Sequence, residues 1–134
     1  MAAQPDPVRT AVDAAVDRYF RAIADRDAAA WAANFAPGGR SEDPVGGDPV
    51  VGRAQLQAFQ QGIFDAFPAL VLTPGERFHG GHQVAVQWTG HVESHTGASA
   101  DFAGINTYEI DSDGKIAAQK AFWDIDAVQR ALGS

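Results

Sequence analysis

The chain of 134 residues contains no cysteine, which excludes disulfide bonds, thiolate catalysis and cysteine-ligated metals. Basic residues are also scarce, because ten Lys and Arg are scattered among 17 Asp and Glu and leave a formal net charge of −7. Phosphate binding depends on clustered Lys and Arg, so this balance argues against a nucleic-acid partner and mildly against an anionic ligand. A neutral, hydrophobic small molecule suits the composition better.

The chain also lacks an apolar stretch long enough to span a bilayer, so we expect no membrane partner. Residues 1–5 contain no basic segment leading into an apolar run, which predicts no secretory signal and a cytoplasmic protein. A hydrophobic fraction of 46% with 20% charged residues is typical of a folded globular protein. At this length we expect residues 1–134 to form a single domain with a substantial core.

Helical signals occupy the first half of the chain. Asp6-Pro7 is a helix-start signal, and the apolar residues that follow at helical spacing predict a helix of about five turns. Asp27 is the expected cap of a second, short helix over residues 28–35, ending at Pro37-Gly38-Gly39. After a brief extended segment over 40–45 and a Gly/Pro-rich loop, apolar spacing predicts a third helix that Pro68 closes.

Beyond Pro68 the pattern changes to that of strands. Segments 71–79 and 83–92 flank Gly80-Gly81, a two-residue hairpin signal, and a strand near 99–110 meets another near 115–123 across a turn. Asp124 or Asp126 is expected to cap a final helical turn. Helices followed by consecutive strands predict an α+β fold, in which helices cover one face of a curved antiparallel sheet.

The most distinctive motif is Glu42-Asp43-Pro44-Val45-Gly46. Pro44 fixes its own φ and restricts Asp43 to extended backbone, while the glycine after Val45 lets the chain turn at once. A carboxylate held in one direction, with apolar sequence on both sides, is a candidate general base. An Asp before Pro is common in turns, so the motif alone does not indicate catalysis. Other residues of the chain are needed to support that interpretation.

Four segments together resemble the ketosteroid isomerases, small enzymes of the NTF2-like superfamily. The specific match is residues 42–49 followed by Gly52. Val16-Asp17-Arg18-Tyr19 resembles the first-helix segment of that family, Ala103 to Tyr108 resembles its strand bearing an oxyanion donor, and Ala121-Phe122-Trp123 resembles its last strand. The resemblance implies an NTF2-like cone, with three helices packed on a curved antiparallel sheet around an apolar pocket.

The resemblance further implies a cofactor-free isomerase that moves a carbon–carbon double bond next to a ketone, as in a Δ5-3-ketosteroid. Asp43 would be the base that shuttles the proton, and Tyr19 and Asn106 would form the oxyanion hole. The family usually has an aspartic acid at the Asn106 position. An amide donates at every pH but more weakly, so we expect a usable oxyanion hole with lower activity.

The walls of this pocket are expected to include four aromatic residues: Trp123, Phe59, Trp88 and Phe35. Purely structural roles are open for two of the proposed catalytic residues. Tyr19 also fits an ordinary core aromatic with a satisfied hydroxyl, and Asn106 also fits a strand residue with a structural partner.

Other functions remain open at this stage. SnoaL-like polyketide cyclases and epoxide hydrolase-cyclases also resemble the chain, and epoxide opening requires a second acid, for which Asp124 is the late-strand candidate. A non-catalytic binding module for a hydrophobic small molecule is a further alternative. His91, Glu93 and His95 alternate along a strand without a convergent further ligand, so we expect no metal site there. The exposed sheet face suggests a homodimer.

Overall fold

The computed structural model describes residues 6–133, so residues 1–5, on which the prediction about a secretory signal rests, lie outside the described part. The helices are α1 (Pro7–Ala24), α2 (Ala28–Ala33), α3 (Arg53–Ala66) and α4 (Ile125–Ala131). The strands are β1 (Phe35–Glu42), β2 (Val50–Val51), β3 (Ala69–Gly80), β4 (Gln83–Glu93), β5 (Ser99–Ile110) and β6 (Ile116–Phe122). None of the helices in this part of the chain is long and apolar enough to cross a membrane.

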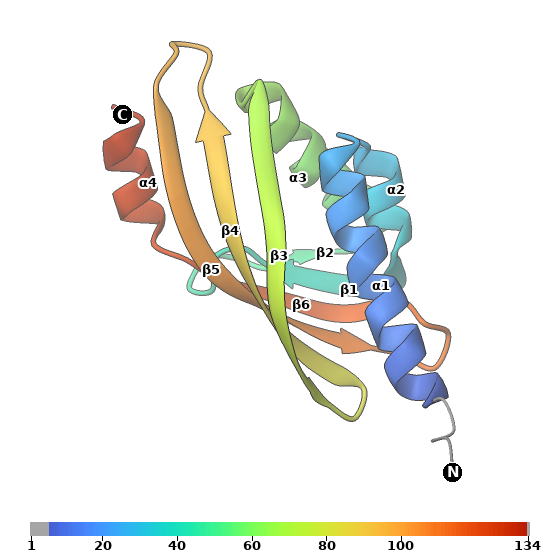
Figure 1. The fold of residues 1–134 in the computed structure, drawn as a ribbon. Helices are drawn as coiled ribbons and strands as arrows, with labels where there is room; N and C mark the ends of the chain where they lie inside the picture. The colour runs from blue at the N-terminus through green and yellow to red at the C-terminus, as the bar shows by residue number, and fades with distance from the viewer. Residues whose placement is uncertain (1–5, 134) are drawn as a thin grey trace.

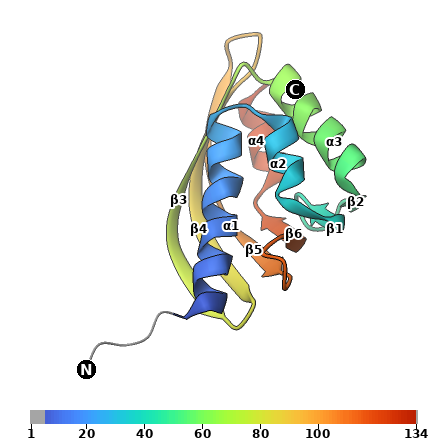
Figure 2. The same ribbon diagram turned by 90° about the vertical axis from the view of Figure 1, so that its right-hand side faces the viewer.

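All the strands belong to one sheet in the order β2-β1-β6-β5-β4-β3. Neighbouring strands are antiparallel except for β1 and β6, which run parallel, so the sheet is mixed. The sheet is strongly curved, with α1, α2 and α3 packed against one face and α4 beside the ends of β4 and β5 (Figures 1 and 2). The predicted α+β class, with helices on one face of a curved sheet, is confirmed, but the sheet is mixed and not antiparallel throughout as predicted, because β1 pairs with β6 in parallel.

Helix α1 begins where the sequence predicts, because the Asp6 carboxylate accepts hydrogen bonds from the backbone N–H groups of Val8 and Arg9, at 3.0 and 3.2 Å. This is the expected N-cap chemistry of an aspartate before a first-turn proline. The apolar stripe of the helix packs into the core, and Val12, Val16 and Tyr19 are fully or almost fully buried. The stripe thereby turns the phenol of Tyr19 toward the inner face of the sheet.

Helix α2 is shorter than predicted and ends at Ala33, while Phe35 already begins β1. The segment Pro37-Gly38-Gly39 lies inside the strand and does not terminate the helix, which corrects the sequence-based boundary. The pairing of β1 with β6 shifts register between Phe35 and Arg40, and a Cβ on Gly39 would lie 2.7 Å from the carbonyl oxygen of Ile116. Gly39 is thus needed because β1 and β6 approach closely at this point, and not because the chain turns there.

Strands β4 and β5 are in a register that places Val86 opposite Asn106 and Trp88 opposite Gly104. Side chains alternate between the two faces of the sheet, so Trp88 and Asn106 both point to the inner face, where both are buried. A Cβ on Gly104 would lie 2.5 Å from a ring carbon of Trp88. Gly104 therefore leaves the space in which the Trp88 indole lies across β5 toward Asn106.

Candidate active site

A cavity of about 280 Å³ opens on the inner face of the sheet. Its wall combines residues from α1, α3 and α4 with residues from β3 to β6 and is predominantly apolar. The three residues predicted to be catalytic come together here, because Tyr19, Asp43 and Asn106 all line this cavity. They approach it from α1, from the segment after β1 and from β5.

Asp43 is held on the cavity wall by the segment that follows β1. The backbone N–H of Val45 donates to the carbonyl oxygen of Ala121 at 2.8 Å, which ties this segment to β6, and the Asp43–Pro44 peptide bond is cis. The indole Nε1–H of Trp123 donates to Asp43 Oδ1 at 2.7 Å. Trp123 therefore fixes one carboxylate oxygen of a residue that lines the cavity.

The electrostatic surroundings of Asp43 make it a stronger base than a carboxylate in water. Burial raises the pKa of Asp43 above its ordinary value, and the hydrogen bond from Trp123 opposes part of that rise. Asp43 is half-buried and lines the cavity. A carboxylate that is surrounded by protein but open to a ligand has the properties of a general base.

Tyr19 is 2% exposed and packs edge-on against Tyr108, with ring centroids 5.1 Å apart. Burial and the negative charge of Asp43 raise the pKa of Tyr19 well above its ordinary value. Three polar groups near the phenol oxygen, on Trp31, Asn106 and Tyr108, oppose that rise. The Trp31 ring nitrogen makes no direct hydrogen bond, but it lies close enough to favour negative charge on the phenol oxygen. Tyr19 consequently stays protonated and remains a hydrogen-bond donor.

Asn106 is 1% exposed and its amide is bonded at both ends. The indole Nε1–H of Trp88 donates to Asn106 Oδ1 at 2.9 Å, and Asn106 Nδ2 donates to the hydroxyl of Tyr108 at 2.9 Å. A side-chain amide carries two N–H groups, so one remains beyond the bond to Tyr108. The structural partners anticipated for Asn106 thus exist, and they leave one N–H unused on a residue that lines the cavity.

Tyr108 was not singled out from the sequence, although a signal for it exists. It stands two residues after Asn106 on β5, and alternation along a strand places such residues on the same face. Burial raises the pKa of Tyr108, and its hydroxyl accepts the bond from Asn106. Its own proton is therefore available to a neighbouring acceptor, and the hydroxyl of Tyr19 is near.

Three of the four predicted wall residues, Trp123, Phe59 and Trp88, line the cavity. Phe35 does not, because it is fully buried behind the wall, where its ring packs against Trp31 with centroids 4.8 Å apart. Helix α4, which the sequence did not indicate as part of the wall, also contributes to it. Apolar residues of α4 and of its C-cap recur at helical spacing and line the cavity: Ile125, Val128 and the C-cap Leu132.

Asp124, the candidate second acid, is exposed and serves as the N-cap of α4, accepting from the backbone N–H of Ala127 at 3.0 Å. Asp43 is thus the one carboxylate among the described residues that line the cavity. The ring of His91 lies outside it, between the carboxylates of Asp101 and Glu93 at 2.6 and 3.1 Å. Residues 6–133 contain no group of three potential metal ligands.

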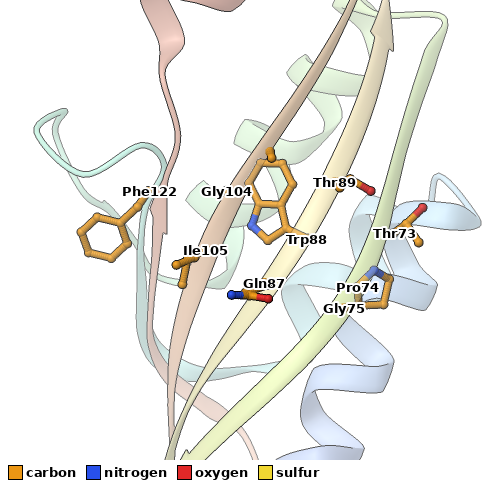
Figure 3. Close-up of a pocket in the computed structure, with 10 residues that line it drawn as sticks. Thr73, Pro74, Gly75, Gln87, Trp88, Thr89, Gly104, Ile105 and Phe122 are labelled. Atoms are coloured by element: carbon orange, nitrogen blue, oxygen red, sulfur yellow. The ribbon is translucent and has the colours of Figure 1, made fainter.

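A second hollow of about 620 Å³ lies on the opposite, outer face of the sheet. Figure 3 shows Gln87 and Ile105 projecting from β4 and β5, with Phe122 beside them. The hollow is open, and its lining contains neither a charged side chain nor a titratable one. Its composition suits a contact surface better than a catalytic site.

The sequence comparisons identify relatives that cover most of the chain. A family model described as "SnoaL-like domain" matches residues 16–119. A steroid Delta-isomerase from Nocardioides simplex is 35% identical over 113 residues, which cover 84% of this chain and 89% of that protein.

Solved structures share the fold over nearly the whole chain. A putative SnoaL-like polyketide cyclase from Jannaschia sp. CCS1 aligns with a TM-score of 0.83 and 22% identity, over 99% of both chains. The protein RV0760c from Mycobacterium tuberculosis, solved in complex with estradiol-17beta-hemisuccinate, aligns with a TM-score of 0.79 and 23% identity, over 87% of this chain and 95% of that one. At these identities the structural matches establish the fold alone.

Proposed function

This chain belongs to the SnoaL-like domain family of the NTF2-like superfamily, and on that premise we propose that it is a cofactor-free isomerase acting on a ketone. The substrate is a Δ5-3-ketosteroid or a similar flat, hydrophobic ketone, whose double bond moves into conjugation. The observation that carries the proposal is that a single carboxylate, a phenol and an amide line one apolar cavity. The 35% identity to a steroid Delta-isomerase supports it.

In the proposed reaction, Asp43 removes a proton from the carbon between the ketone and the double bond. The electron pair released by that C–H bond shifts toward the carbonyl oxygen and forms a dienolate, which Tyr19 and Asn106 stabilise by hydrogen bonds. The neutral Asp43 carboxyl group then returns the same proton to the far carbon of the dienolate, and the electrons move back. No atom is gained or lost, so the reaction requires no co-reactant.

Proximity and stabilisation of charge would accelerate this reaction. A carboxylate is a weak base in water, and holding it against the reacting carbon replaces an encounter in solution with a step inside one complex. The raised pKa of Asp43 increases its affinity for the proton, and the raised pKa of Tyr19 keeps the phenol protonated as a donor. Tyr19 is therefore protonated as the donor requires, and Asp43 is a stronger base at pH values where its carboxyl group is ionised.

Two alternatives use the same cavity. Epoxide opening needs a second acid, and the exposed capping role of Asp124 counts against it. An aldol-type cyclisation of a polyketide would use the same base and donors, and the SnoaL-like relatives support it. Appearance of conjugated enone absorbance from a Δ5-3-ketosteroid distinguishes isomerisation from cyclisation. Tight steroid binding without any turnover by the unaltered protein would instead favour a binding module.

Isomerase activity should fall at acidic pH, with the acid limb of kcat/KM above the ordinary pKa of an aspartate. The base works only when ionised, and burial raises the pKa of Asp43, so protonation disables it at a higher pH than in water. Trp123→Phe removes the hydrogen bond that opposes this rise, so the limb should move to still higher pH. A pH profile unchanged in Trp123→Phe would contradict this assignment of the base.

We also propose that the chain forms a homodimer through the outer face of the sheet, where Phe122 and Ile105 are 47% and 41% exposed. A chain with a net charge of −7 repels its own copy, and the hollow, whose lining is uncharged, is where two copies approach with the least repulsion. A two-fold contact sets the same surface against itself, which this uncharged hollow permits.

Sedimentation velocity measures the mass of the assembly directly. The intact protein should sediment with the mass of two chains, and Phe122→Asp should shift it to the mass of one by burying a charge at the contact. Glu109→Asp, an exposed change outside the hollow, serves as the control. A single-chain mass for the unaltered protein at micromolar concentration would contradict the dimer.

A further inference from the structure

The orientation of the Asn106 amide decides whether this residue stabilises or repels an oxyanion. One orientation offers N–H groups to the Tyr108 hydroxyl and to the cavity. A flipped amide would instead turn its carbonyl oxygen toward the Tyr108 hydroxyl and the cavity. Trp88 distinguishes the two, because an indole N–H is a donor only and needs an acceptor opposite it. With Oδ1 toward Trp88, the bond of 2.9 Å forms, and Nδ2 bonds Tyr108 at 2.9 Å.

We propose that Trp88 is a positioning residue for the oxyanion hole: its ring N–H holds the Asn106 amide so that one amide N–H bonds Tyr108 and the other is directed to the substrate oxygen. This proposal rests on the proposed isomerase function. In the flipped amide, two donors would face each other across a buried contact, and leaving a buried donor unpaired is unfavourable. The flipped amide is therefore rarely populated while the Trp88 N–H is present.

The Trp88 ring is itself held on several sides, so it provides a fixed reference for the amide. It is 4% exposed and meets Phe102 edge-on, with ring centroids 5.3 Å apart. On β5 it lies against Gly104, where any Cβ would collide with the ring. A donor fixed by packing keeps its direction when the ligand changes, which is what preorganisation requires.

The same contact gives a physical reason for asparagine at this position. A carboxyl group at residue 106 would also accept the Trp88 N–H, and a hydrogen bond donated to a carboxylate favours its ionised form. An ionised carboxylate has no proton to donate and repels a developing oxyanion. A neutral amide accepts from Trp88 and donates to the cavity at once, so Trp88 and Asn106 work as a coupled pair.

A double-mutant cycle tests this role. Trp88→Phe removes the N–H and keeps an aromatic ring, and Asn106→Leu keeps a similar shape without the amide. In the unaltered background, Trp88→Phe should lower kcat roughly tenfold with little change in KM, which is part of the 10²–10³-fold that a full donor contributes. In the Asn106→Leu background, the same substitution should have no further effect. An equal loss in both backgrounds would overturn the proposal, because it would reveal a packing role alone.

Binding of 2-naphthol gives a readout that does not depend on turnover. Its fluorescence distinguishes naphtholate from neutral naphthol, and the oxyanion hole should favour naphtholate. Trp88→Phe should lower the bound ratio of naphtholate to naphthol about tenfold, matching the loss in kcat. In the Asn106→Leu background, Trp88→Phe should leave this ratio unchanged. If the steroid is not isomerised but this pattern holds, the isomerase function fails and the role of Trp88 stands. If the folded unaltered protein binds no naphtholate, both fail.

Benzothienylalanine at position 88 separates the N–H from the ring volume. This analogue replaces the ring N–H of tryptophan with sulfur and keeps the bicyclic shape, so it removes only the donor. It should reproduce the losses of Trp88→Phe in kcat and in the naphtholate ratio. Full activity with the analogue would contradict the role of the N–H and leave only packing.

Discussion

Asp43→Asn is expected to lower kcat for the isomerisation by about 10⁴-fold, the upper end of what a positioned general base contributes. Asparagine has the shape of aspartate, and its carbonyl oxygen can still accept the bond that Trp123 donates at 2.7 Å. It cannot take a proton from carbon under these conditions. Conjugated enone absorbance measures the rate, and because the packing is preserved, the loss should fall on kcat more than on KM.

Stability provides the control for Asp43→Asn. Burial raises the pKa of Asp43 in the folded protein, so the folded state disfavours the ionised carboxylate. The carboxylate therefore lowers the free energy of unfolding as pH rises from the ordinary aspartate pKa through the raised one. At neutral pH, Asp43→Asn should unfold at the same denaturant concentration as the unaltered protein or at a higher one. An active Asp43→Asn variant would rule out Asp43 as the base.

Tyr19→Phe is expected to lower kcat by roughly 10²–10³-fold, the effect of removing one donor from an oxyanion hole. The ring remains in place against Tyr108 and Trp31, with centroids 5.1 and 5.8 Å away, so the fold should not change. Only the hydroxyl on the cavity wall is removed, and KM should change little because the substrate ketone is a weaker acceptor than the dienolate.

Tyr108→Phe is the matched control, because it removes a hydroxyl that bonds Asn106 from a residue outside the cavity lining. We expect a loss smaller than that of Tyr19→Phe, since the substrate oxygen keeps both of its donors. Equal losses in the two variants would mean that the Tyr19 hydroxyl supports the core and does not contact the substrate.

Local chemistry accounts for the elements that the sequence predicted well. Asp6, Asp27 and Asp124 each accept a backbone N–H at the start of a helix, and such caps depend on only a few neighbouring residues. Turn signals likewise located the strand ends closely, because Gly80-Gly81 and the turn between β5 and β6 also depend on a few neighbouring residues. The three candidate catalytic residues were identified through a family resemblance, and their meeting in one cavity was a consequence of the fold.

Long-range contacts account for what the sequence did not reveal. The start of β1 at Phe35 depends on β6, a strand more than eighty residues away, against which Gly39 must pack without a side chain. The parallel pairing of these strands has no local signal. The bond between Trp88 and Asn106 likewise follows from the register of β4 and β5 and from the space left by Gly104.

The central claim, that one carboxylate carries a proton from carbon to carbon, is tested most directly with a labelled substrate. In a Δ5-3-ketosteroid with two deuterium atoms on the carbon between the ketone and the double bond, Asp43 should transfer one deuteron to the far carbon. Mass spectrometry should then find both deuterium atoms in a substantial fraction of the enone product. A product that has exchanged the transferred deuteron completely with water, or labelled enone formed equally fast by Asp43→Asn, would contradict the account.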